Sequence, residues 1–386
     1  MGILLKNIYH NMYLSGRSKN SALEAKHMFY RSVNNMRKTI MHVLNTGTYS
    51  GAENVVMTII SALRLNNDYD FIYVSLDGSI SEVCKNNNIR FVPIEKMSIS
   101  EIRRVVKVYR PDIIHAHDFT ASIICACSGI HLPVISHLHN NPPWLQKYCI
   151  NSFAYLFSCL RYVRILAVSK SILDEYIFSN FIKKISIVVS NPVDISIVQE
   201  KAKLVSNKKE GYDIVFIGRL SIPKNPQRFI GIIDKVRKDF PTIKAAIIGA
   251  GILENECRII IEQSNLNSNI ELLGFIENPY GILSNSKMLC ITSDWEGFGL
   301  VAVEALSLGK PVIATPVGGL PSIVNNDCGR LCETDDEFAV EIKQLLLDKT
   351  YWCKKSKMAL NRAKYLNNIY AYIALITEIY NSEIAK

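Results

Sequence analysis

Short runs rich in valine and isoleucine alternate with amphipathic stretches along most of this chain of 386 residues. The first set of runs comprises Thr39–Leu44, Phe71–Ser75, Asp112–Ala116, Pro133–His137, Ile165–Val168 and Ile185–Val189. The stretches between them, such as Ala52–Leu65 and Ser100–Tyr109, have the apolar spacing of surface helices. Strands that alternate with helices predict βαβ units and a parallel sheet covered by helices.

The alternation restarts after Glu200–Tyr212, a polar segment that we interpret as an interdomain linker. The second set of runs comprises Asp213–Ile217, Ile243–Ile248, Ile270–Leu273, Met288–Ile291 and Pro311–Ala314. We therefore expect an α/β protein with two Rossmann-like, doubly wound domains at residues 37–205 and 206–365. A C-terminal helix at 366–386 can cross back to the first domain, and residues 1–36 form an N-terminal extension. Because open sheets bind ligands at the carboxyl ends of their strands, two facing sheets predict one central cleft.

The net charge and the cysteine content limit which binding partners and which cellular compartment are expected. The formal charge is +9, from 44 Lys and Arg against 35 Asp and Glu, which favours anionic partners such as phosphates, nucleotides or an acidic membrane surface. No motif or basic run indicates nucleic-acid binding. The ten cysteines contain no C-x-x-C pair, so we expect reduced thiols rather than disulfides or a zinc ribbon. Met1–Tyr30 lacks the pattern of a signal peptide, and we expect a cytoplasmic protein.

Two cations follow the first strand of the second domain, in the sequence Gly218-Arg-Leu-Ser-Ile-Pro-Lys-Asn. Arg219 and Lys224 lie between a strand end and a helix, so both can point into the cleft. Guanidinium and ammonium groups suit phosphate oxygens, which makes this loop a candidate phosphate site. The alternative is a pair of solvated surface cations.

The sharpest motif is Asp294–Ala305, in which Gly297 and Gly299 permit a tight loop before a helix at Leu300–Leu308. The first N–H groups of that helix can face a diphosphate. Glu304, one turn into the helix, can accept hydrogen bonds from ribose hydroxyls, and Glu296 can reach a sugar. The alternative is two glutamates on a helix surface.

Two further glycine loops are interpreted as turns. Gly249 and Gly251 begin a dinucleotide-binding pattern, but Glu254 stands where the third glycine would be, which disfavours a nicotinamide cofactor. A turn between strand and helix explains both glycines better. The loop Thr315–Pro321 is expected to close the pocket from below without touching a ligand.

The first domain contributes a glycine loop and two histidine pairs. Gly51, at the start of a helix, lets the backbone approach a phosphate or sugar from the opposite side of the cleft. His115 with His117, and His137 with His139, each share one face of a strand. Four histidines can bind a metal, but only Asp118 is a carboxylate close in sequence, so we expect no metal site. Instead, one histidine of each pair is expected to face the cleft and the other to pack.

Together these motifs resemble glycosyltransferase family 4 over about Thr39–Asn381. The most specific element is E-x7-E, matched by Glu296 and Glu304. The sequences that reinforce it are Gly218–Asn225, the Gly249/Gly251 turn, the His-x-His strand end, Ala167–Ser169 and Asn191–Asp194. The first loop departs from the family pattern, because Ser50-Gly51 stands where Gly-Gly is common.

The resemblance implies the GT-B fold and a retaining transfer of sugar from a nucleotide-sugar, without an essential metal or other cofactor. It implies that Arg219 and Lys224 bind the diphosphate and that Glu304 binds the ribose. Donor contacts are further implied for Gly218, Glu296, the loop Gly297–Leu300 with Phe298 and Gly299, and, from the first domain, His117 and Gly51. The implied acceptor is a glycan or a polyprenyl-diphosphate-linked sugar in O-antigen, capsule or other surface-polysaccharide assembly.

Other classes stay open at this point: an epimerase of nucleotide-sugars with the same fold, or a basic protein without enzymatic activity that binds anions or lipid. The uncharged stretch Phe119–Gln146 is too interrupted by proline and polar residues to span a membrane, and we interpret it as a buried helix, strand and loop. Peripheral attachment through this stretch, Tyr148–Leu160, Arg161 and Arg164 is the alternative.

Overall fold

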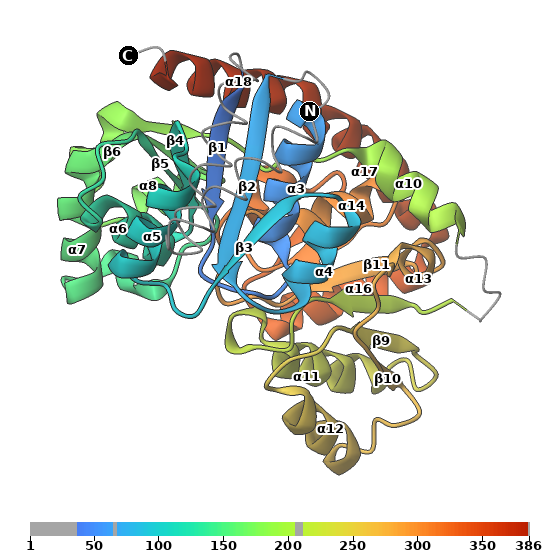
Figure 1. Ribbon diagram of the computed structural model, residues 1–386. Helices are drawn as coiled ribbons and strands as arrows, with labels where there is room; N and C mark the ends of the chain where they lie inside the picture. Colours follow the sequence, from blue (N-terminus) through green and yellow to red (C-terminus); the bar gives the residue numbers. More distant parts are fainter. Residues whose placement is uncertain (1–36, 65–67, 205–210, 385–386) are drawn as a thin grey trace.

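The computed structural model describes residues 37–64, 68–204 and 211–384, so the predicted extension at 1–36 lies outside the described residues. Two α/β domains face each other, and each is built on a parallel sheet (Figure 1). The prediction of two doubly wound domains is therefore confirmed.

The N-terminal sheet has seven strands in the order β3-β2-β1-β4-β5-β6-β7, and every neighbouring pair is parallel. Its strands are β1 (Lys38–Val43), β2 (Tyr69–Leu76), β3 (Arg90–Ile94), β4 (Ile113–His117), β5 (Val134–Leu138), β6 (Tyr162–Ala167) and β7 (Ser186–Val188). The α-helices are α3 (Gly51–Leu63), α4 (Ser79–Asn86), α5 (Ile99–Tyr109), α6 (Phe119–Cys127), α7 (Ile150–Ser158), α8 (Lys170–Asp174), α9 (Ser179–Ile182) and α10 (Ile195–Leu204). Short 3-10 helices are η2 (Pro143–Gln146), η3 (Cys159–Arg161) and η4 (Lys183–Ile185).

The C-terminal sheet has six strands in the order β10-β9-β8-β11-β12-β13, again all parallel. Its strands are β8 (Ile214–Ile217), β9 (Ala245–Ile248), β10 (Ile270–Gly274), β11 (Met288–Ile291), β12 (Val312–Ala314) and β13 (Gly329–Leu331). The helices are η5 (Ile222–Lys224), α11 (Pro226–Arg237), α12 (Glu254–Gln263), α13 (Tyr280–Ser284), α14 (Leu300–Ser307), α15 (Leu320–Ile323), α16 (Asp335–Leu347), α17 (Lys349–Leu366) and α18 (Ile369–Ile384).

The central strands are apolar at nearly every position because helices cover both faces of each sheet. Strand β11, for example, is buried over its whole length, and so is β9. Polar residues mark where helices begin: Thr334 accepts a hydrogen bond from the amide of Glu337, whose side chain caps the helix start in return. The buried strands and the helix caps together determine where the strands end, and the candidate site lies at those strand ends.

The predicted linker is partly wrong. Glu200–Leu204 belongs to helix α10, which packs against α13 and α14 of the C-terminal domain, and residues 205–210 lie outside the described residues. Lysine and glutamate there form the solvent face of an amphipathic helix, whose composition is easily mistaken for that of a linker.

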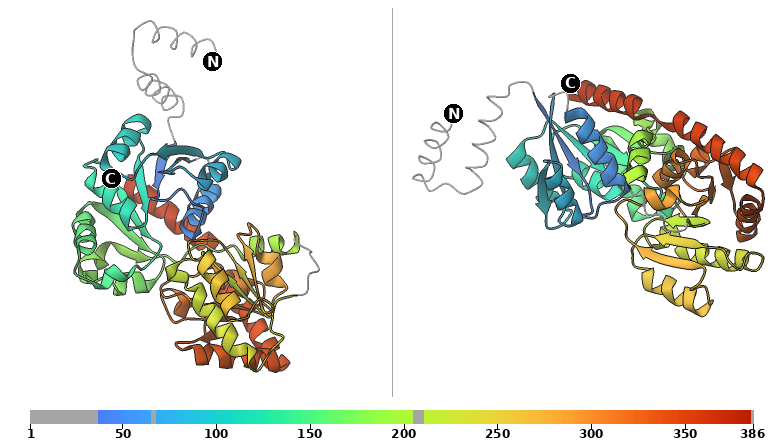
Figure 2. Two further views of the ribbon diagram at one scale, coloured as in Figure 1. Left: turned by 90° about the horizontal axis from the view of Figure 1, so that it is seen from below. Right: turned by 90° about the vertical axis from the view of Figure 1, so that its right-hand side faces the viewer.

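The last helix, α18, returns to the N-terminal domain, where it packs on α3 and β4 (Figure 2). Its buried face includes Ile376 and Tyr380, which join Ile40 and Ile59 in one apolar cluster. Glu383 is almost fully buried and pairs with Arg164 of β6 at 3.2 Å. Arg164 is therefore an ion-pair partner of α18, which disfavours the alternative in which this cation faces a membrane.

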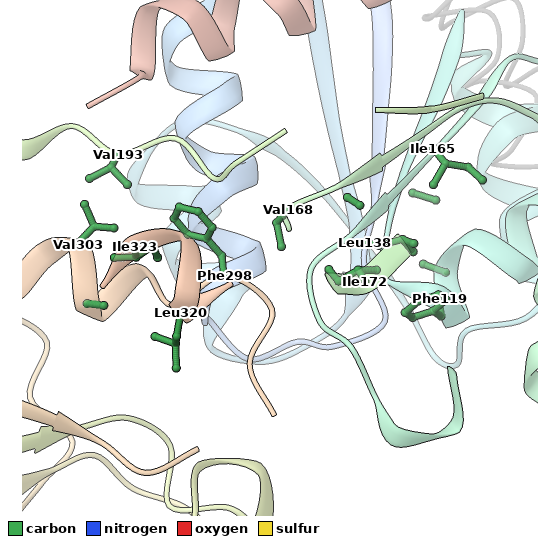
Figure 3. Close-up of a cluster of buried hydrophobic side chains, with 14 of the residues drawn as sticks. Phe119, Leu138, Ile165, Val168, Ile172, Val193, Phe298, Val303, Leu320 and Ile323 are labelled. Atoms are coloured by element: carbon green, nitrogen blue, oxygen red, sulfur yellow. The ribbon is translucent and has the colours of Figure 1, made fainter. Parts of the chain in front are cut away.

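The two domains share apolar packing at their interface. One buried cluster continues from Val168 and Val193 to Phe298 and Leu320 of the C-terminal domain (Figure 3). Phe298 is only 4% exposed, so its ring belongs to this cluster rather than to a surface that faces a ligand. This packing holds the start of α14 against the N-terminal domain.

The uncharged stretch Phe119–Gln146 is mostly buried, as helix α6, strand β5 and the turn η2. Its interpretation as a buried helix, strand and loop is confirmed for most of its residues. Within residues 37–64, 68–204 and 211–384, no helix combines the length and the apolar character needed to cross a bilayer. All ten cysteines are free thiols, as the sequence predicted.

Candidate active site between the two domains

Lys224 and Glu296 meet at the carboxyl ends of β8 and β11. The ammonium of Lys224 donates to the Glu296 carboxylate, which also accepts from the Ser293 hydroxyl at 3.4 Å. The Lys224 side chain is 29% exposed and that of Glu296 is 12% exposed. This ion pair, formed by residues 72 positions apart, joins the two motifs that the sequence singled out.

Hydrogen bonds lock the loop that carries Lys224. Asn225 has a left-handed backbone with φ of 44° and caps α11 by accepting from the amide of Arg228. Its side-chain amide donates to Asp294 at 3.1 Å, while Thr292 donates to the carbonyl of Asn225 at 2.8 Å. The amide of Asp294 donates to the carbonyl of Pro223 at 2.8 Å. Lys224 is thus held on a fixed backbone rather than on a loose loop.

The glycines of the Glu296 loop allow close approach of backbones. A Cβ atom on Gly297 would overlap the carbonyl oxygen of His139 in the other domain. Gly299, with φ of +99°, stands immediately before α14, where L-residues with side chains are strained. A Cβ atom on Gly318 would overlap the carbonyl oxygen of Glu296, so the Thr315–Pro321 loop supports this loop from beneath.

Glu304 lies on α14 and accepts a hydrogen bond from the Tyr280 hydroxyl at 3.0 Å. Burial raises the pKa of Glu304, whereas the hydrogen bond from Tyr280 opposes that rise. Glu304 also lies near Tyr49 of the N-terminal domain, because its charge contributes to the raised pKa of Tyr49 after burial and Glu53. A Cβ atom on Gly51 would lie 3.8 Å from Cδ1 of Leu300, so the Gly51 loop faces the start of α14.

The remaining predicted cation, Arg219, is exposed and follows Gly218 at the end of β8. A Cβ atom on Gly218 would lie 3.9 Å from Cγ of Lys224, which places this glycine beside the lysine stem. Gly249 and Gly251 approach the backbones of Gly218 and Leu220 closely. Their interpretation as a turn is confirmed, since the space that a side chain would need is filled by the neighbouring loop.

The histidines differ from expectation. His115, His117 and His137 are fully buried, and only His139 is partly exposed. The expectation that one histidine of each pair faces the cleft is therefore wrong for His115 and His117. The ring of His117 has no exposed surface in this conformation, so it cannot contact a donor here as predicted. Side chains on neighbouring strands cover it, which a strand-end pattern does not reveal.

Several residues near the site escaped the sequence argument. Tyr280 and Tyr49 approach Glu304 only through tertiary contacts, and nothing in their local sequence marks them. His42 stands opposite His115 on the neighbouring strand β1. His42 lies near a strand end and on the same face as the other histidines, and this position could have identified it as their neighbour from the sequence.

Two family models match consecutive parts of the chain. The model described as Glycosyltransferase Family 4 matches residues 49–197, and the model described as Glycosyl transferases group 1 matches residues 198–365. The boundary between them falls within α10, between the two sheets.

Relatives and solved structures agree with this division. The chain is 26% identical over 368 residues to N-acetylgalactosamine-N,N'-diacetylbacillosaminyl-diphospho-undecaprenol 4-alpha-N-acetylgalactosaminyltransferase of Campylobacter jejuni, covering 86% of this chain and 97% of that protein. It is 29% identical over 238 residues to an uncharacterised glycosyltransferase of Methanocaldococcus jannaschii, covering 56% of this chain and 58% of that protein.

Among solved structures, Anabaena HepE in complex with UDP and glucose superimposes with a TM-score of 0.78 at 18% identity, covering 90% of this chain and 100% of that chain. A sucrose-phosphate synthase from Thermosynechococcus elongatus gives a TM-score of 0.73 at 17% identity, covering 90% of this chain and 100% of that chain. These likenesses show the GT-B fold. With both domains matched by glycosyltransferase models, the chain belongs to the glycosyltransferases of the family 4 type, and it is an enzyme of that class.

Proposed function

We propose that this enzyme transfers a sugar, with retention of anomeric configuration, from a nucleotide-sugar to a glycan or polyprenyl-diphosphate-linked acceptor in surface-polysaccharide assembly. The observation that carries the proposal is the Lys224–Glu296 pair beside the glycine-rich start of α14. The names of two Campylobacter jejuni relatives describe N-acetylgalactosaminyl transfer to undecaprenol-linked acceptors, and a capsular polysaccharide glycosyltransferase of Staphylococcus aureus is 28% identical over 204 residues. HepE was solved with UDP-glucose.

The charges of the site suit a leaving diphosphate. As the glycosidic bond breaks, negative charge develops on the phosphate, and preorganised cations and N–H groups stabilise it. Lys224, Arg219 and the first amides of α14 supply that potential in our proposal. Without donor, Glu296 neutralises Lys224. A bound diphosphate would compete for the ammonium and leave the carboxylate to the sugar hydroxyls.

We propose that Glu304 binds the ribose. Replacing Glu304 by alanine removes a charged acceptor, and hydrogen bonds to charged groups are worth about 1.5–3 kcal/mol. Donor affinity should therefore fall by about 10- to 150-fold, as measured by calorimetry with a panel of nucleotide-sugars. Glu262→Ala, on the exposed face of α12 in the same domain, is the control. Unchanged affinity of a folded Glu304→Ala protein for nucleotide-sugars would contradict the assignment of Glu304 to the ribose.

We also propose that no metal is essential for transfer, because cationic side chains are available for the phosphate charge. Turnover should survive incubation with EDTA, measured as nucleoside diphosphate release with acceptor present. Loss of turnover that a divalent ion restores would contradict this part of the proposal.

We propose that the enzyme lies peripherally on the cytoplasmic face of the membrane, because exposed apolar side chains and cations share one surface. Apolar side chains gather on and beside α7, each between 68% and 86% exposed, and they form what we call the α7 apolar surface: Tyr148, Ile150, Phe157, Leu160 and Phe181. Exposed cations stand in the same segments: Lys147, Arg161, Lys183 and Lys184. Apolar groups among cations suit acidic lipid head groups.

Flotation with vesicles tests this surface. The double variant Lys183→Glu, Lys184→Glu should bind anionic vesicles about 30-fold more weakly, since each cation near an acidic bilayer is worth about 1 kcal/mol. The matched control is Lys354→Glu with Lys357→Glu, two exposed lysines on α17. Equal binding of both double variants, or no binding of the unaltered protein to anionic vesicles, would refute the membrane surface.

A further inference from the structure

Five histidines lie together on one face of the N-terminal sheet. Four come from the neighbouring strands β1, β4 and β5, and His139 directly follows β5. The strand register places His42 beside His115 and His117 beside His137. The same rows carry isoleucine nearer the amino ends of the strands, as in Ile113 and Ile135, which are buried under α3 and α18. Toward the carboxyl ends, the core thus changes from isoleucine to stacked imidazoles. Packing of an apolar core does not require imidazole side chains at these positions.

The rings form two hydrogen-bonded chains. In the first, Nδ1 of His42 contacts Nε2 of His117 at 2.9 Å, and Nδ1 of His117 contacts Nε2 of His139 at 2.9 Å. In the second, the Tyr380 hydroxyl contacts Nδ1 of His115 at 2.7 Å, and Nε2 of His115 contacts Nδ1 of His137 at 3.2 Å. Both chains end on ring nitrogens that point to no protein group.

Three buried ring nitrogens have no hydrogen-bond partner among the described residues: Nε2 of His42, Nε2 of His137 and Nδ1 of His139. Leaving a buried polar atom unpaired costs about 1–3 kcal/mol. A ring nitrogen of this kind can bind a metal ion instead of a hydrogen-bond partner. Neutral imidazole is the form that binds metal ions.

We propose that His117, His137 and His139 form a three-histidine binding site for Zn²⁺. One ring nitrogen from each lies within 4.8 Å of the others. Ligands about 2.0–2.1 Å from a tetrahedral zinc ion lie about 3.3 Å apart, so only small ring movements are needed. The ion would occupy the orphan Nε2 of His137 and would take the place of the hydrogen bond between Nδ1 of His117 and Nε2 of His139.

The outer histidines fit the role of supporting partners. With His117 bound through Nδ1, its Nε2–H donates to His42. With His137 bound through Nε2, its Nδ1–H donates to His115, whose own Nδ1–H then donates to the hydroxyl oxygen of Tyr380. Metal-binding histidines are commonly oriented by such second hydrogen bonds.

A second triad, His42 with His115 and His117, is also compact, but all three rings are fully buried. His139 is the partly exposed member of the proposed site, which places this triad nearer to solvent than the other. Asp118 does not compete, because its carboxylate accepts from the amide of Ala121 and caps α6. A site of nitrogen donors alone favours zinc over magnesium or calcium.

Zinc binding at these histidines would be independent of sugar transfer. The site would join the carboxyl ends of β4 and β5, next to the point where the carbonyl of His139 faces Gly297. We assign the ion a structural role within the N-terminal domain, where its three ligands lie, which is compatible with turnover that does not require metal. Its test therefore uses binding and stability, and no sugar donor.

The test is metal binding by the full, untagged chain after removal of metals. We expect one tightly bound Zn²⁺ per chain, a higher melting temperature with zinc, and the visible absorption bands of tetrahedral Co²⁺ when cobalt is used as the probe. His139→Gln should weaken binding by at least about 100-fold and abolish these bands, because even a supporting partner is worth about 10- to 100-fold.

His131→Gln is the matched control, since His131 is exposed and outside the cluster. Circular dichroism checks that each variant is folded. His139 is chosen before His137 because its partial exposure makes misfolding less of a concern. Failure of the unaltered chain to retain zinc, or equal zinc affinity of a folded His139→Gln and His131→Gln, would overturn the proposal.

Discussion

Replacing Lys224 by methionine should lower kcat by about 10²–10³-fold, the loss seen when one preorganised electrostatic donor is removed from an active site. Methionine keeps the apolar stem of the side chain but removes the ammonium that faces Glu296. The backbone should be unaffected, because Asn225, Asp294 and Thr292 hold the loop through their own hydrogen bonds. Steady-state kinetics with saturating donor measures the effect.

Lys235→Met is the control for this variant. Lys235 lies on α11 of the same domain and pairs with Asp336 on the surface, where an ion pair contributes little. Its kcat should stay within about twofold of that of the unaltered enzyme. If Lys224→Met kept full kcat while remaining folded, the cation beside Glu296 would have no part in stabilising the leaving group.

Replacing Gly297 by alanine should lower kcat/KM by about 10²-fold or more, with little change in the stability of either domain. The added methyl group would overlap the carbonyl oxygen of His139, so the two domains could not approach as they do here. A displacement of about 1 Å at a reacting group can cost 10²-fold in rate. Kinetics and thermal unfolding together separate this effect from misfolding.

Gly231→Ala supplies the matched glycine control. A Cβ atom on Gly231 would meet nothing within 4 Å, and the residue lies inside helix α11. Alanine should stabilise that helix by about 0.5–1 kcal/mol and leave activity unchanged. Full activity of Gly297→Ala would show that the contact with His139 is not needed during catalysis.

The fold was predictable because strands buried on both faces have a distinctive composition. Runs such as Met288–Ile291 are apolar at every position, and the helices between them alternate at helical spacing. The linker was misjudged at Glu200–Leu204, where the polar face of α10 outweighs its apolar one in composition. The ion pair of Arg164 could not be predicted, because its partner Glu383 lies on a helix that returns from the other end of the chain.

The site was predictable where its parts follow strand ends. Lys224 and Glu296 could be expected to meet because β8 and β11 are neighbours in a sheet whose strand order follows from the fold. Tyr280 could not be found, because its contact with Glu304 depends on how α13 packs against α14. The burial of His117 depends on rings from two other strands, and a local pattern carries no information about such packing.

Release of nucleoside diphosphate tests the proposed transfer most directly. Purified enzyme would be incubated with a panel of nucleotide-sugars labelled in the sugar, with and without polyprenyl-diphosphate-linked saccharides. A glycosyltransferase that uses the Lys224–Glu296 site should release nucleoside diphosphate and move the label to the acceptor only when both substrates are present, and Lys224→Met should fail to do so. Conversion of the donor into an isomeric nucleotide-sugar without acceptor, or no reaction with any donor and acceptor tested, would contradict it.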